Sequence, residues 1–232
     1  MEPTSANGQP EPTSSLLSHL WYEGGRWWGG LCLTLGFSMR VEGFHNMPEK
    51  GPVLVIANHQ SFFDPWMIGT AVRRHMTYLA RKTLFRNPYF AWLIRSLNAV
   101  PIDQDGVGKE GIRTIIGQLR QQRAVLVFPE GERTGDGDMH PFRPGIHLLI
   151  RKAEAQIVPV GVAGAYDAYP RSQPFPTFAP LFWPPGKGTI AVSIGEPVDS
   201  RRFAELPREQ AMAELFELLH QAQQRAEKLR RK

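Results

Sequence analysis

The sequence predicts a single α/β domain in which a mostly parallel sheet is covered by helices on both faces. Its 232 residues suit one large α/β domain, and no internal repeat divides them. Short apolar runs alternate with longer segments of helical pattern through the middle of the chain, which is typical of parallel strands joined by helices. Hydrophobic residues make up 42% and charged residues 21%, as expected for a protein with a full core.

The chain begins with two segments that we separate from this core. Residues 1–15 are rich in proline, serine and threonine and have the composition of a disordered leader. Residues 16–39 form a Trp-rich amphipathic segment, which favours either a membrane interface or a helix packed on the core. Glycines between residues 24 and 36 argue against a firm helix, and the apolar run 27–39 is too short to span a membrane.

The predicted core covers residues 40–200. Its strands are predicted from short apolar runs at residues 53–57, 76–80, 99–102, 124–128, 157–162 and 189–194. Its helices are predicted at residues 65–72, 88–97, 106–122 and 144–153, and in residues 106–122 the isoleucines and leucine fall on one helical face. Residues 170–188 are crowded with proline and are predicted to form a loop.

Residues 201–232 are predicted to form a final helix, over residues 209–228, with a basic tail. The net charge is +5, and the last ten residues hold five basic residues and one acidic residue, a net of +4, so the rest of the chain totals +1. By charge alone such a tail suits an anionic membrane surface or nucleic acid, and a solvated helix end is the third possibility. Nucleic-acid binding is not expected, because no aromatic residues are interleaved with the basic ones.

Cysteine content and hydropathy indicate a compartment. A single cysteine excludes an internal disulfide and a cysteine-rich metal site, which favours a reducing environment. The first residues lack the basic start of a secretory signal, and no run reaches the ~18 apolar residues of a transmembrane helix. We therefore expect a cytoplasmic protein associated peripherally with the inner face of the membrane.

The segment NHQSFFD, residues 58–64, follows the first strand of the predicted core, where functional groups gather in a parallel sheet. His59 and Asp64 would point about 140° apart on a continuous helix, so they meet only if a turn separates them. Asp64 precedes Pro65 and is expected to be the N-cap of the next helix. Two interpretations remain open: Asp64 caps this helix, or it orients an imidazole that takes a proton from a hydroxyl.

A second polar segment, FPEGERT at residues 128–134, follows another strand and is expected at the same edge of the sheet. Gly131 lets a substrate approach the backbone closely, and Arg133 offers planar donors to a phosphate or carboxylate. Downstream, FRPG at residues 142–145 opens a helix, and IVPV at residues 157–160 returns to the core.

Together these blocks resemble the glycerolipid acyltransferase family, typified by the 1-acylglycerol-3-phosphate acyltransferases. NHQSFFD is similar to the family's NHx4D motif, FPEGERT to its FPEGTRS block, FRPG to the turn that follows, and IVPV to its fourth block. The segment RKTLFRNPYFAWLIRSLNAVPID, residues 81–103, resembles the second block. The blocks occur in the expected order over residues 40–197, and ordered blocks are far more specific than a single HxxxxD.

The resemblance implies a reaction. An acyl group would pass directly from a thioester, on coenzyme A or acyl carrier protein, to the hydroxyl of a lysophospholipid, with 1-acylglycerol-3-phosphate as the first expectation. His59 would be the base that activates the hydroxyl, and Asp64 would orient it. The family needs neither an acyl-enzyme nucleophile nor a metal or other cofactor.

The resemblance also implies an acceptor site. Its residues would be Glu130, Gly131, Arg133, Lys82 and Arg143. Arg133 is the first candidate to bind a phosphate, and Lys82 matches a basic position of the second block. Two departures leave the acceptor open: Gln104 stands where the second block commonly has arginine, and Glu132 where the third block usually has a small hydroxyl residue.

Other chemistries remain as alternatives. With water as the acceptor, the same histidine would make a thioesterase. Residues 106–111 match the dinucleotide-binding pattern GxGxxG, and Glu130 lies nineteen residues later, but acidic residues between strand and glycine would oppose a pyrophosphate. Residues 136–138 resemble the start of a calcium loop but lack its remaining ligands, and His140 and His147 have no partner at ligand spacing.

Overall fold

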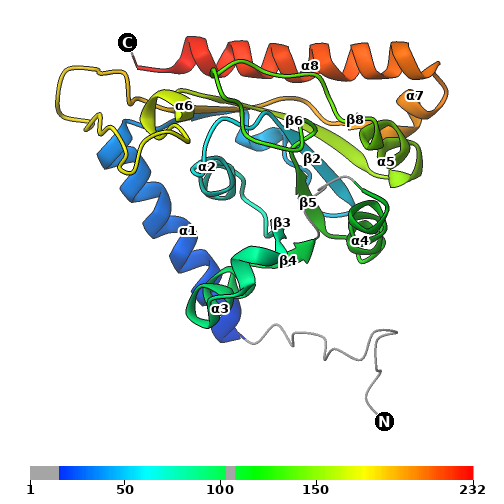
Figure 1. Ribbon diagram of the computed structural model, residues 1–232, viewed down its shortest axis with the longest axis horizontal. Helices are drawn as coiled ribbons and strands as arrows, with labels where there is room; N and C mark the ends of the chain where they lie inside the picture. The colour runs from blue at the N-terminus through cyan, green and yellow to red at the C-terminus, as the bar shows by residue number, and fades with distance from the viewer. Residues whose placement is uncertain (1–15, 103–107, 232) are drawn as a thin grey trace.

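A computed structural model describes residues 16–102 and 108–231, and it confirms the mostly parallel α/β fold (Figure 1). The described strands are β1 (Arg40–Glu42), β2 (Val53–Ala57), β3 (Met76–Arg81), β4 (Ala99–Ile102), β5 (Ala124–Val127), β6 (Gln156–Ala163), β7 (Ala191–Ile194) and β8 (Val198–Asp199). They form one sheet in the order β1-β7-β6-β2-β5-β3-β4, with β8 beside β6. Every pairing is parallel except those of β6 with β7 and with β8.

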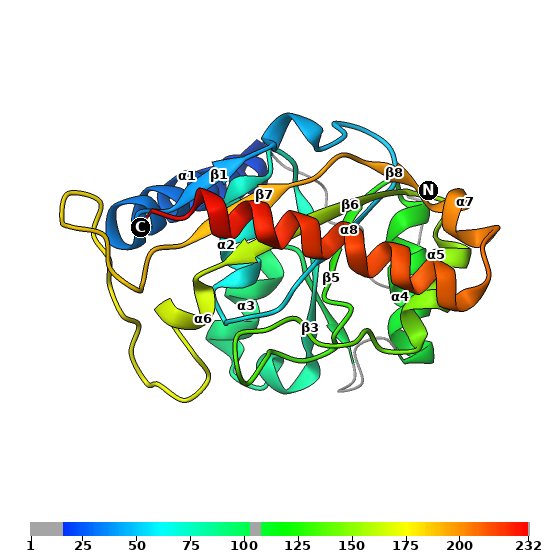
Figure 2. The same cartoon turned by 90° about the horizontal axis from the view of Figure 1, so that it is seen from above.

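Helices cover both faces of the sheet, as predicted. One face carries α1 (Leu16–Phe37) and α2 (Asp64–Ala71). The other carries α4 (Lys109–Arg120), α5 (Gly145–Ala153), α7 (Ser200–Ala204) and α8 (Arg208–Leu229), and α8 runs across the sheet in Figure 2. The shorter elements α3 (Pro88–Ser96), α6 (Ala165–Ala168), η1 (Phe44–Asn46) and η2 (Lys82–Phe85) lie in the connections.

The central strand β2 shows why the sheet is buried on both sides. All five of its residues are buried. Val53 and Val55 join the apolar cluster beneath α1 and α2, whereas Leu54 and Ile56 join the cluster beneath α4, α5 and α8. Alternate residues of a strand point to opposite faces, so a continuous apolar run is what a doubly covered strand requires.

Most predicted elements agree with the structure within a few residues. The strands β1 and β8 were not predicted, because three and two residues carry no readable pattern. The helix predicted over residues 106–122 is observed as Lys109–Arg120. Residues 106 and 107, and the predicted leader 1–15, lie outside the described residues.

The expectation that glycines prevent a firm helix in residues 16–39 is wrong. Leu16–Phe37 is a single helix of 22 residues. A Cβ at Gly29 would clash with the indole of Trp66 on α2, so this glycine is the point where the two helices approach closely. Close packing against α2 therefore offsets the low intrinsic helix propensity of glycine. Within residues 16–102 and 108–231, no helix is long and apolar enough to cross a membrane.

The basic C-terminal tail is partly folded onto the domain rather than free. The guanidinium of Arg230 lies 3.0 Å from Asp167 and 3.0 Å from Glu227. Arg231 donates to the carbonyl of Leu181 at 2.6 Å. Two of the tail's positive charges thus fasten the end of α8 to neighbouring loops.

Candidate active site

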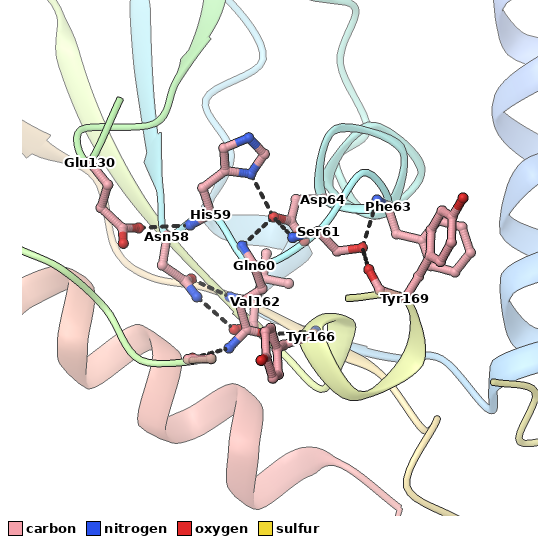
Figure 3. A network of polar contacts seen from close by, with 11 residues as sticks. Asn58, His59, Gln60, Ser61, Phe63, Asp64, Glu130, Val162, Tyr166 and Tyr169 are labelled. Carbon is pink, nitrogen blue, oxygen red and sulfur yellow. Dashed lines mark hydrogen bonds and ion pairs between the residues drawn. The ribbon is translucent and has the colours of Figure 1, made fainter. Parts of the chain in front are cut away.

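His59 and Asp64 meet directly after β2, as the second interpretation of NHQSFFD requires (Figure 3). His59 Nδ1 lies 2.7 Å from Asp64 Oδ2, and the imidazole stacks on Phe128 with ring centroids 3.8 Å apart. Asp64 is fully buried, whereas 17% of the His59 side chain is exposed. A carboxylate only accepts hydrogen bonds, so Nδ1 carries the proton, and Nε2 points away from Asp64 with its lone pair available.

Asp64 is not the N-cap of α2, contrary to the prediction. Phe63 occupies that position, and Asp64 is the first helical residue. Its Oδ2 accepts hydrogen bonds from the backbone N–H groups of Gln60 at 2.5 Å and Ser61 at 2.7 Å, while Oδ1 is buried with no partner among the described residues. One carboxylate oxygen therefore fixes the turn and the imidazole together.

The FPEGERT loop clamps the backbone of His59 from both sides. Glu130 Oε1 accepts the His59 N–H at 2.8 Å, and the Thr134 N–H donates to the His59 carbonyl at 2.9 Å. Glu130 Oε2 accepts the His140 N–H at 2.9 Å. Burial raises the pKa of Glu130 to about 7. Glu130 was expected to shape the acceptor site; in the structure its carboxylate positions the backbone of His59 and His140.

Two further residues of the NHQSFFD segment fix its shape: Asn58, for which no role was predicted, and Gln60, which was predicted only as part of the turn between His59 and Asp64. The Asn58 side chain donates to the Val162 carbonyl at 2.9 Å and accepts the Val162 N–H at 2.7 Å, which joins the end of β2 to β6. The Gln60 amide donates to the Gly137 carbonyl at 3.0 Å. The first residue of the NHx4D motif was the available signal, since a buried asparagine is satisfied by such a pair of backbone groups.

Near the His59–Asp64 pair, Arg133 carries a positive charge that forms no ion pair with a carboxylate of the described residues. Its guanidinium lies over the ring of Phe62 at 3.4 Å, and its Nη1 is buried with no hydrogen-bond partner among residues 16–102 and 108–231. Burial lowers the pKa of Arg133, and the positive charges of Arg171 and Arg81 lower it further, against the opposing effect of Asp64. A partly buried guanidinium with like charges acting on it is an environment that a bound anion would stabilise.

The two arginines beside Arg133 were not predicted, and Lys82 takes another position. Lys82 Nζ lies 3.4 Å from Glu110 Oε1 at an exposed site. Arg81, the preceding residue at the end of β3, is the second-block cation whose charge acts on Arg133. The departure at Gln104 lies outside the described residues.

Arg143 and Gly131 are engaged with the loop itself. Arg143 forms an ion pair with Glu132 at 2.7 Å and donates to the Glu130 carbonyl at 3.1 Å. Gly131 has φ +80°, and a Cβ there would come within 3.0 Å of the Arg143 side chain. The space left by Gly131 is therefore filled by Arg143 rather than open to a substrate. The negative charge added at Glu132 is offset by the same arginine.

The acidic turn at residues 136–138 closes on itself. Asp136 accepts from the Thr134 hydroxyl at 2.6 Å and lies 3.1 Å from His140 Nε2. No group of three His, Cys, Asp or Glu side chains in the described part of the chain is arranged to hold a metal ion.

Comparison with known proteins identifies the family. Residues 38–163, more than half of the chain, match the family model described as Acyltransferase. The chain belongs to the acyltransferase family. The predicted enzyme class is thereby confirmed, and the four blocks found in the sequence lie on the fold expected for it.

Relatives support the same assignment in sequence and in structure. The chain is 28% identical over 190 residues to the 1-acyl-sn-glycerol-3-phosphate acyltransferase of Bacillus subtilis, covering 82% of this chain and 88% of that protein. It is also 28% identical over 200 residues to a lyso-ornithine lipid O-acyltransferase of Pseudomonas aeruginosa, covering 81% of this chain and 75% of that one. The crystal structure of the 1-acyl-sn-glycerophosphate acyltransferase of Thermotoga maritima is similar with a TM-score of 0.75 and 27% identity, covering 91% of this chain and 80% of that chain.

Proposed function

We propose that this acyltransferase transfers a fatty acyl group from a thioester donor, acyl-CoA or acyl-ACP, to the free hydroxyl of a lysophospholipid. The favoured acceptor is 1-acylglycerol-3-phosphate, and the product is then phosphatidic acid. The observation that carries this proposal is the His59–Asp64 pair, held near the partly buried guanidinium of Arg133, whose Nη1 has no hydrogen-bond partner among the described residues. The Bacillus and Thermotoga relatives, which are named for 1-acylglycerol-3-phosphate as acceptor, support the same choice.

His59 Nε2 is the proposed base. It takes the proton from the acceptor hydroxyl as the oxygen attacks the thioester carbonyl, so that a C–O bond forms and the C–S bond breaks. The proton then passes from His59 to the departing thiolate. Asp64 stabilises the imidazolium that exists between these steps, since it is a buried carboxylate 2.7 Å from Nδ1. The reaction requires no cofactor beyond the thioester.

The acceptor phosphate is proposed to bind Arg133, with Arg81 and Arg171 as neighbouring cations. A guanidinium suits a phosphate because its planar donors match two oxygens at once. Arg143 and Lys82 are assigned a smaller part than the sequence suggested, because both lie beside carboxylates of the protein.

The second candidate is an acyltransferase acting on a different lyso-lipid. The Pseudomonas relative that is named for a lyso-ornithine lipid acceptor shares as much identity as the Bacillus enzyme. The positive charges of Arg171 and Arg81 that act on Arg133 favour the phosphate-bearing acceptor over this alternative.

We further propose that the enzyme works at the inner face of the membrane. The helix α1 exposes 70% of Trp27 and 68% of Trp28, and tryptophan is suited to a membrane–water interface. An enzyme attached at the interface could act on an apolar acceptor that stays in the bilayer, so the acceptor would not have to be extracted into water.

A panel assay tests the function. Labelled acyl-CoA or acyl-ACP is offered with lysophosphatidic acid, another lysophospholipid, an ornithine-containing lyso-lipid or no acceptor, and products are read by mass spectrometry. Preference for lysophosphatidic acid, lost in Arg133→Ala, is the expected result. Preference for the ornithine lipid establishes the second candidate. Release of free fatty acid without acylated product means that the enzyme is a thioesterase.

A further inference from the structure

A groove of about 520 Å³ lies between η2 and α3, and none of the residues that line it has a part in the proposed reaction. It is lined by Phe85, Arg86, Pro88, Ala91, Trp92, Arg95 and Ser96. We propose that this groove binds the phosphate headgroup of an anionic phospholipid of the membrane. This proposal goes beyond acyl transfer. It rests on the membrane association proposed above and adds a site for a lipid headgroup on the surface that faces the membrane.

Charge is the first observation that selects this occupant. Arg86 and Arg95 both line the groove and are exposed, and no acidic residue lines it. Neither guanidinium has an ion-pair partner among the described residues. The Arg95 guanidinium lies over the ring of Phe85, 5.1 Å from its centroid, and this aromatic contact does not neutralise its charge. Two unpaired arginines at one groove suit a phosphodiester, whose oxygens accept from both.

The rim of the groove is the second observation. Next to it, 85% of Tyr89 and 63% of Trp92 are exposed, which is unusual for large aromatic side chains in water. Trp92 lies against Trp21 of α1 with ring centroids 5.8 Å apart, and the Trp21 indole donates to Ser96 at 3.1 Å. Aromatic side chains gathered around arginines match the headgroup level of a bilayer, where one side is apolar and the other carries phosphates.

The position of the groove links it to the membrane side of the enzyme. In Figure 1, α3 lies beside the N-terminal end of α1, and the contact of Trp21 with Trp92 joins the two helices there. The helix η2 alone separates Arg86 from Arg81, a rise of about 10 Å at 3₁₀ spacing. A headgroup held in the groove would therefore anchor the protein within a short distance of the cations around Arg133.

A soluble nucleotide is the rival occupant, because the adenosine phosphates of a coenzyme A donor combine an aromatic ring with phosphates. The broad exposed rim favours the lipid: Tyr89 and Phe90 extend the apolar surface beyond the groove, where a nucleotide would leave them in water.

Vesicle binding of the full chain, without acyl donor or acceptor, tests the proposal. The vesicles are phosphatidylcholine alone or with about a third phosphatidylglycerol, compared by co-sedimentation at low salt. The variant is Arg86→Gln/Arg95→Gln, and the matched control is Arg113→Gln/Arg120→Gln, which removes the same charge from exposed positions of α4 on the opposite face of the sheet. Adenosine 3′,5′-bisphosphate is added as competitor.

We expect the groove variant to lose about ten- to thirtyfold in affinity for the anionic vesicles, while the control loses less than about threefold and binding to phosphatidylcholine is unchanged. Equal losses in the two variants would overturn the proposal, as would displacement of the protein by the nucleotide. Acyl transfer is measured separately on both variants with a short-chain soluble acceptor. Retained turnover together with lost vesicle binding separates this proposal from the proposed function.

Discussion

Replacement of Asp64 by asparagine tests how the buried carboxylate serves the histidine. In the wild type, Oδ2 accepts from His59, Gln60 and Ser61, and Oδ1 is buried without a partner. In Asp64→Asn the amide oxygen can keep the two backbone bonds, but the amide nitrogen then occupies the place of Oδ1 as an unsatisfied donor. We expect a loss of about 1–3 kcal/mol in the free energy of unfolding. Turnover should fall on the order of 10³-fold, because a neutral amide does not stabilise the imidazolium.

Denaturant unfolding measures the stability of the variant, and single-turnover acyl transfer measures the chemical step. His59→Ala and the double variant complete a cycle. If Asp64 acts through His59, the double variant should be no slower than His59→Ala alone, since residues that act as one unit are not additive. Glu110→Gln, at an exposed carboxylate, is the control and should keep wild-type turnover. Our reasoning is refuted if Asp64→Asn keeps more than about a tenth of wild-type turnover.

Three further changes address the loop, the acceptor and the packing. Burial raises the pKa of Glu130 from 4.5 to about 7, so this group stabilises the fold below pH 4.5 and the contribution is lost as pH rises through 7. The stability of the wild type relative to Glu130→Gln should then fall by about 2–3 kcal/mol between about pH 5 and about pH 8, measured by urea unfolding. Arg133→Ala should raise KM for a phosphate-bearing acceptor at least about tenfold and leave that for a phosphate-free acceptor near its wild-type value. Gly161→Ala should destabilise by about 1–3 kcal/mol, because its Cβ would meet the α8 backbone at Ala222, whereas Gly117→Ala, with open space around it, should not destabilise.

Each of these expectations has a contrary outcome. A wild type and a Glu130→Gln variant whose stabilities change in parallel with pH would show that Glu130 ionises as an ordinary carboxyl group. Equal rises in KM for both acceptors would remove the phosphate from the role given to Arg133. Equal thermal midpoints for Gly161→Ala and Gly117→Ala would mean that the α8 backbone at Ala222 can shift away from the added Cβ at little cost in stability.

The fold was largely predictable because its central strands are buried on both faces. When the neighbouring segments are predicted to be helices, a continuous apolar run such as Val53–Ala57 is best interpreted as a strand buried on both faces. The edge strands β1 and β8 were missed, since their pairing is decided by distant partners on β7 and β6. The helix α1 was misjudged for a related reason: Gly29 lowers helix propensity locally but permits the contact with α2 that stabilises the helix.

The site was predictable where the residues that contact each other belong to one short motif. His59 and Asp64 are five residues apart, and one turn brings them into contact. Arg171 follows the short helix α6, far from Arg133 in the chain, so only the folded chain lets its charge act on Arg133. The contacts of Glu130 could not be predicted either. Its carboxylate accepts backbone N–H groups, and every residue type except proline has such a group, so the sequence does not reveal the partners.

The most direct test of the account is the rate of acyl transfer by His59→Ala, measured with lysophosphatidic acid and a saturating thioester donor. Equilibrium binding of the acceptor to the same variant controls for misfolding. We expect that binding is kept while turnover falls by about 10²–10⁴-fold, the range for loss of a general base. Turnover above about a tenth of the wild-type value, with binding intact, would contradict the role of His59 as the base.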